Sequence, residues 1–66
     1  MQIQLNGETL EVADRLTAAD LLAQLDLQGQ RLAMEVNEEI VPRSRYADTE
    51  LRPGDRVEIV RAIGGG

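Results

Sequence analysis

Several residue types are missing from this chain, and each absence removes a class of chemistry. The 66 residues include no cysteine, histidine or lysine, and the only serine is Ser44. Without cysteine there is no disulfide, thiolate metal site or thiol nucleophile. Without histidine the usual general base and the commonest metal ligand are absent. No serine or cysteine relay can form, so the sequence predicts a protein that is not an enzyme on its own and holds no metal.

The charge balance excludes further partners. Twelve acidic residues against seven arginines give a net charge of −5. Nucleic-acid binding depends on basic patches that neutralise phosphates, so this balance argues against a nucleic-acid partner. It also argues against anionic membrane surfaces. Apolar runs are too short to span a bilayer, and the first residues lack the blocks of a signal peptide, so we expect a cytoplasmic protein.

Alternating apolar and polar residues in the first twelve positions predict a β-hairpin. Asn6-Gly7 is a strong signal for a two-residue turn because both positions tolerate positive φ. A turn there places Ile3 opposite Leu10 and Met1 opposite Val12. All four side chains then lie on one face, so the turn and the hydrophobic pattern predict the same register.

The next segment predicts a short amphipathic helix over residues 18–26, before Gly29. Thr17 is a suitable N-cap, and Asp20 places negative charge in the first turn. Apolar residues follow with the i, i+3, i+4, i+7 spacing of a helical stripe. Leu16 and Leu21 have the spacing of a hydrophobic staple.

The second half predicts three more strands. Residues 31–37 alternate, with Leu32, Met34 and Val36 on one face and Ala33 and Glu35 on the other. A turn at 37–39, where Asn37 takes positive φ, leads to a short strand ending near Pro42. Residues 43–55 are predicted to be mostly loop, with a type II turn at Pro53-Gly54, and residues 56–63 form the last strand. This order predicts an α+β fold, a sheet with one face covered by the helix.

The element order and three segments resemble a known family. The segments are LRPGDRVEIV (51–60), VNEEIVPRS (36–44) and AIGGG (62–66). Together they resemble the ubiquitin-like β-grasp proteins and, within them, the ThiS-type sulfur carriers of thiamine (thiazole) biosynthesis. The resemblance covers the whole chain. It implies a mixed four- to five-stranded sheet with one main helix on one face, a β-grasp domain over 1–63 and a flexible glycine tail over 64–66. Gly64 stands where a bulkier residue is often found.

The resemblance also implies a function. In such families a ubiquitin-activating-type adenylating enzyme (ThiF-like) uses ATP and Mg²⁺ to adenylate the C-terminal carboxylate, here that of Gly66. A sulfur donor such as a cysteine desulfurase then converts it to a thiocarboxylate, which delivers sulfur to thiazole synthase (ThiG-like). The chain would be a protein co-substrate that binds no cofactor itself. Consistent with this, the terminal glycines precede no helix and lack the lysine of a phosphate-binding loop.

Two sets of site residues follow. Gly64, Gly65 and Gly66 would enter the partner's active site, because glycine backbone is thin and conformationally free. Four apolar residues are candidates for partner docking, with ordinary exposure or a second small core as the alternative; they are Ala33, Val60, Ala62 and Ile63. Three other functions stay open: a sulfur carrier for molybdopterin or tRNA thiolation, a ubiquitin-like protein modifier, and a binding module whose tail is irrelevant. The absence of lysine makes self-linked chains improbable.

Overall fold

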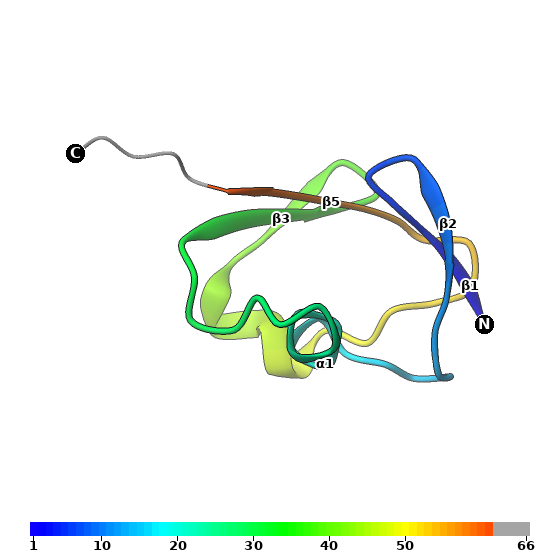
Figure 1. The fold of residues 1–66 in the computed structure, drawn as a ribbon, viewed down its shortest axis with the longest axis horizontal. Helices are drawn as coiled ribbons and strands as arrows, with labels where there is room; N and C mark the ends of the chain where they lie inside the picture. Colours follow the sequence, from blue (N-terminus) through cyan, green and yellow to red (C-terminus); the bar gives the residue numbers. More distant parts are fainter. Residues whose placement is uncertain (62–66) are drawn as a thin grey trace.

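The computed structural model describes residues 1–61, which form one five-stranded sheet covered on one face by helices (Figure 1). The sheet is mixed, with strand order β2-β1-β5-β3-β4. β1 and β5 are parallel, and the other neighbouring strands are antiparallel. In chain order the elements are β1 (Gln2–Leu5), β2 (Glu8–Glu11), α1 (Ala18–Gln24), β3 (Leu32–Val36), β4 (Glu39–Val41), the 3-10 helix η1 (Arg43–Asp48) and β5 (Arg56–Arg61). The α+β class and the covered sheet predicted from the sequence are confirmed.

The first hairpin has the predicted turn and register. Asn6 and Gly7 both adopt positive φ, at 50° and 84°, as a two-residue turn of the primed type requires. Ile3 pairs with Leu10. Beyond the paired strands, the Val12 N–H donates to the Met1 carbonyl at 2.8 Å. The short-range turn signal and the hydrophobic pattern therefore agree with the fold.

Helix α1 begins as predicted but ends earlier. Thr17 is the N-cap, and its side chain and that of Asp20 form a reciprocal capping box. The helix stops at Gln24 rather than 26 because Asp26 adopts φ 59°. The Leu27 N–H then donates to the Leu22 carbonyl at 2.8 Å. This is the Schellman pattern, with an aspartate in the left-handed position that glycine usually occupies.

Residues 43–48 were predicted as loop, and that prediction is wrong for this stretch. They form η1, which starts directly after Pro42 and contacts α1. The Thr49 hydroxyl donates to the Arg45 carbonyl at 2.7 Å and satisfies one carbonyl of the final turn. Tyr46 is buried and supplies the reason for the helix, since η1 carries its ring into the core.

The core lies between the sheet and the two helices. Ile3, Met34 and Val57 come from the three central strands and are almost fully buried. Burying an aliphatic side chain of this size contributes about 1.5–3 kcal/mol, so these strands and α1 stabilise one another. The complete set of buried apolar residues is Ile3, Val12, Ala18, Leu21, Leu22, Met34, Tyr46, Leu51 and Val57.

Candidate functional site

The candidate site starts where the central strand ends. β5 is the third of five strands in the sheet order, and it is bonded to β1 on one side and β3 on the other. Arg61 is its last residue and pairs with Leu32. Of the candidate site residues, Ala62, Ile63, Gly64, Gly65 and Gly66 lie outside the residues that the structure describes.

Covalent geometry limits the working distance of the terminus. Five residues follow Arg61 in the sequence. A chain spans at most about 3.6 Å per residue. Any group at Gly66 therefore lies within about 18 Å of Arg61. If Gly66 is the reacting residue, as the sequence predicts, its reaction partner lies close to or inside that radius.

Two turn asparagines hold β5 in place, a role that the sequence reasoning missed. The Asn6 side-chain oxygen accepts from the Ile59 N–H at 2.9 Å, and its NH₂ donates to the Ile59 carbonyl at 3.3 Å. The Asn37 side-chain oxygen accepts from the Arg56 N–H at 3.0 Å, and its NH₂ donates to Asp55 at 3.0 Å. Both asparagines have positive φ. In the sequence, both asparagines are accounted for by their preference for turns. Nothing in the turn signal indicates that their side-chain amides also bind β5.

Two of the predicted docking residues meet on the outer face of the sheet. Ala33 of β3 is directly opposite Val60 of β5. Both are exposed, and Val60 retains 60% of its accessible surface. They lie on the face away from α1, because their neighbours Met34 and Ile59 point toward the core. The structure thus places an apolar pair on the uncovered face, beside the end of β5.

A third apolar residue on this face, Ile40, was not predicted. Ile40 of β4 is 73% exposed and pairs with Glu35 of β3, which in turn pairs with Glu58 of β5. Alternation in the short strand could have found it, since Val41 faces the core and Ile40 therefore faces outward. The outer face thus combines exposed apolar side chains with two carboxylates on facing positions.

Buried acidic or basic side chains are absent from the part of the chain that the structure describes. No polar or charged side chain is buried among residues 1–61, and no group of three or more acidic residues there could hold a metal ion. Active sites normally contain buried or closely coupled titratable groups. Neither helix of this part of the chain is long and apolar enough to cross a membrane.

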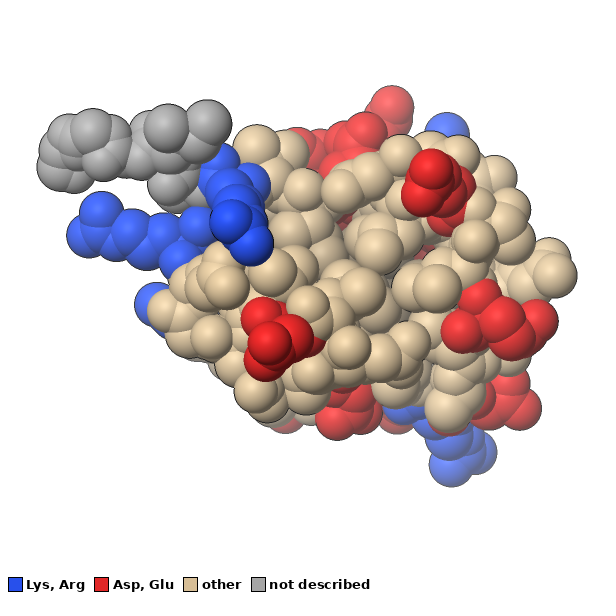
Figure 2. Space-filling model, in the orientation of Figure 1, with Lys and Arg blue, Asp and Glu red and all other residues tan. Residues whose placement is uncertain are grey.

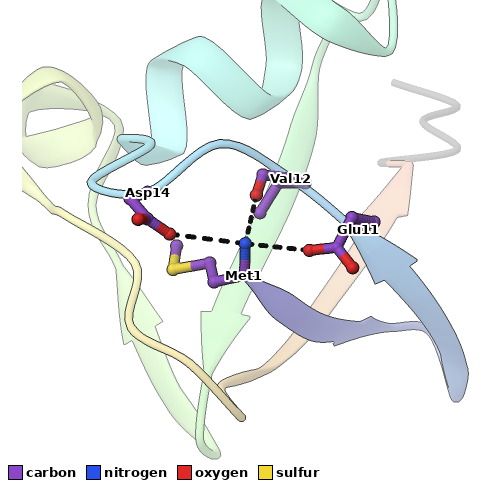
Figure 3. A network of polar contacts seen from close by, with 4 residues as sticks. All are labelled: Met1, Glu11, Val12 and Asp14. Carbon is purple, nitrogen blue, oxygen red and sulfur yellow. Dashed lines mark hydrogen bonds and ion pairs between the residues drawn. The ribbon is translucent and has the colours of Figure 1, made fainter.

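The most constrained charge is the α-ammonium of Met1 (Figure 3). It donates to the Val12 carbonyl at 2.6 Å and forms ion pairs with Glu11 at 2.8 Å and Asp14 at 3.4 Å. The hydrogen bond to Glu11 is the main cause that raises the pKa of this group above its ordinary value of 8.0. The chain has no lysine, and these contacts favour the protonated form of the α-ammonium.

Comparison with known proteins decides the family. A model of the ThiS family matches residues 3–66. The chain belongs to the ThiS family. The Bacillus subtilis sulfur carrier protein ThiS is 40% identical over 65 residues, which are 97% of this chain and 98% of that protein. The crystal structure of a ThiS thiamine biosynthesis protein from Geobacter metallireducens superposes with a TM-score of 0.88 at 32% identity, and the match covers 100% of both chains.

A second kind of relative is much longer than this chain. The thiazole synthase of Paramagnetospirillum magneticum is 41% identical over 66 residues, and the chain spans only 20% of its length. With the ThiS matches, the predicted family and β-grasp fold are confirmed, and the strand number is five. The boundary between a domain at 1–63 and a tail at 64–66 stays a prediction.

Proposed function

We propose that this chain is a sulfur carrier protein for thiazole formation in thiamine biosynthesis and acts as a protein co-substrate through the Gly66 carboxylate. The observation that carries the proposal is the ThiS family match, which spans the β-grasp body and the glycine end as one unit. The described residues support the proposal, since they include exposed apolar side chains on the outer face of the sheet and the central strand β5, which the glycine end follows in the sequence.

The proposed chemistry takes place on the partner enzymes. A carboxylate is a poor electrophile, so a ThiF-like adenylating enzyme with bound ATP and Mg²⁺ first joins the Gly66 carboxylate to AMP and releases pyrophosphate. A persulfide sulfur, supplied by a donor such as a cysteine desulfurase, then displaces AMP at the acyl carbon. Cleavage of the sulfur–sulfur bond by a thiol leaves the thiocarboxylate. This chain provides the acyl group, and the cytoplasm is the compartment in which we expect these partners.

A ThiG-like thiazole synthase is the proposed acceptor. The Paramagnetospirillum thiazole synthase includes a stretch similar to the whole of this chain. In a single polypeptide the effective concentration of one segment near another is in the millimolar range. Such an arrangement favours a direct reaction between a carrier segment and a synthase segment, and we propose the same encounter between separate chains here.

Intact mass spectrometry tests the proposal. The chain is incubated with ATP, Mg²⁺, the adenylating enzyme and a persulfide source. We expect the mass change of one oxygen replaced by one sulfur, located at Gly66 by fragmentation. A variant lacking Gly66 should keep its thermal unfolding curve and show no exchange. Exchange in that variant, or none in the intact chain with an active enzyme, would overturn the proposal.

The acceptor is tested separately. Thiocarboxylated chain is offered to thiazole synthase, to molybdopterin synthase components and to a tRNA-thiolation enzyme. Sulfur transfer should occur with thiazole synthase. Transfer only to one of the other two would assign the alternative sulfur-carrier function, and amide linkage of Gly66 to lysines of other proteins would indicate a ubiquitin-like modifier.

A further inference from the structure

Three arginines lie at the end of β5 or near it. We call Arg31, Arg43 and Arg61 the root arginines. Arg61 is the last residue of β5 and pairs with Leu32, the neighbour of Arg31 in the chain. Arg31 and Arg43 line one hollow of about 320 Å³, together with Gln30, Leu32 and Tyr46. Figure 2 shows several basic side chains gathered at one end of this face, on its left, whereas most of the acidic side chains are spread over the rest.

The root arginines form no ion pair with another residue of the described part of this acidic chain. The chain carries twelve acidic residues and seven arginines, yet within residues 1–61 the ion pairs are those of the Met1 ammonium. All three root arginines are exposed. Exposed like charges repel one another, so their grouping carries a small cost to the isolated domain. A negatively charged surface on a partner would attract the root arginines and offset this repulsion.

The distance between Arg61 and Gly66 determines which anions of the partner enzyme the root arginines can contact. A nucleotide that reacts with the Gly66 carboxylate lies close to that carboxylate, at the far end of a segment that can extend about 18 Å from Arg61. An extended segment therefore leaves the root arginines at the entrance of the partner's active site, away from the nucleotide. Protein carboxylates at that entrance are the anions within reach.

We propose that the root arginines dock on an acidic rim around the entrance through which the adenylating partner receives the glycine tail. This inference rests on the proposed function and adds the surface and the partner chemistry. The guanidinium groups form charge-assisted hydrogen bonds to carboxylates and steer the overall acidic chain so that its terminus arrives first. Charge complementarity of this kind acts mainly on the association rate.

Two charge-matched double variants test the proposal. Arg31→Gln with Arg61→Gln removes two root arginines, and Arg15→Gln with Arg52→Gln removes two arginines elsewhere. Each change takes the net charge from −5 to −7, since two positive charges are lost. Arg52 precedes β5, so the length of that strand separates it from Arg61. Thermal unfolding of both variants should match the unchanged chain, because all four side chains are exposed.

The readout is the rate at which the adenylate forms. It is measured as the release of pyrophosphate in the presence of purified adenylating enzyme. We expect the root variant to raise KM about 2- to 25-fold with kcat unchanged, since each of the two exposed charge pairs contributes about 1.4- to 5-fold. The control variant should change KM less than the root variant does, because net charge alone acts weakly at physiological salt. The KM of the unchanged chain should rise with salt, and that of the root variant should rise less.

The outcomes separate this inference from the proposed function. If the unchanged chain is never adenylated, the proposed function fails. If it is adenylated and the two double variants have the same KM, the acidic rim is wrong and the function stands. A fall in kcat alone would also contradict docking at the entrance, because it would place the arginines at the reacting groups.

Discussion

The Asn6 side chain bonds to both the backbone N–H and the carbonyl of Ile59, a residue 53 positions later in the chain. β1 itself ends at Leu5, whose partner on β5 is Val57. The asparagine amide therefore extends the support of β5 two residues beyond the end of β1, toward Arg61. A turn residue thus helps to determine how firmly the strand before the tail is held.

Asn6→Gly tests this support. Glycine keeps the positive φ of the turn at no steric cost, so the substitution removes mainly the two side-chain bonds. We expect a loss of about 1–2 kcal/mol of unfolding free energy in urea, together with faster hydrogen exchange of the Ile59 amide. Asn6→Asp keeps the oxygen that accepts from the Ile59 N–H. Its unfolding free energy should lie between those of the unchanged chain and Asn6→Gly. Unchanged exchange at Ile59 in Asn6→Gly would refute the role.

Val60→Asp and Val57→Asp form a matched pair on one strand. Val60 is 60% exposed on the outer face, and Val57 is 1% exposed against the core. Burying a carboxylate without a partner is strongly unfavourable, so Val57→Asp should unfold the domain. Val60→Asp should keep its melting temperature within a few degrees and weaken binding to the adenylating partner, measured by titration calorimetry. Full binding by Val60→Asp would remove Val60 from the docking surface.

The facing carboxylates offer a stabilising change. Glu35 and Glu58 are direct cross-strand partners on β3 and β5, and like charges at such positions are destabilising. Glu58→Gln should therefore raise the unfolding free energy by about 0.2–1 kcal/mol at low salt, with a smaller gain at high salt. Glu8→Gln, on the edge strand β2, serves as the control and should show no comparable gain. An equal gain in both variants would assign the effect to net charge.

The Met1 network predicts a pH dependence of stability. Its contacts raise the pKa of the α-ammonium above 8.0, with the hydrogen bond to Glu11 first among the causes. A raised folded-state pKa adds stability that is fully present below pH 8 and is lost as the pH rises through the folded-state value. Melting temperatures should therefore decline above pH 8. The decline should be smaller in Glu11→Gln with Asp14→Asn, and an identical decline would exclude this network as its source.

Local signals in the sequence predicted the parts of the fold that short segments determine. Asn6-Gly7 fixes the first turn, and Thr17 with Asp20 fixes the start of α1. Alternation identified the core-facing residues of β3, because side chains in a strand point to opposite faces with period two. Once β3 and β5 are paired in this register, Ala33 and Val60 lie directly opposite each other.

The features that sequence reasoning missed depend on contacts between distant segments. η1 forms where Tyr46 packs into the core. Residues 43–48 have no hydrophobic periodicity that would predict a helix. Asp26 ends α1 in a conformation that glycine adopts more readily. The second role of Asn6 needs β5 as its partner. Pairing of distant strands also brings Arg31 close to Arg61, which are 30 positions apart in the chain (61 − 31).

The position of β5 links the completion of synthesis to folding. Strands β1 and β3 have no direct ladder between them, because β5 lies between the two and bonds to both. A nascent polypeptide that has not yet produced residues 56–61 consists of two hairpins with no strand to join them. The ribosome must therefore translate residues 56–61 before the domain can close. A copy that ends within β5 would stay open to proteolysis and would not compete with folded copies for partner enzymes.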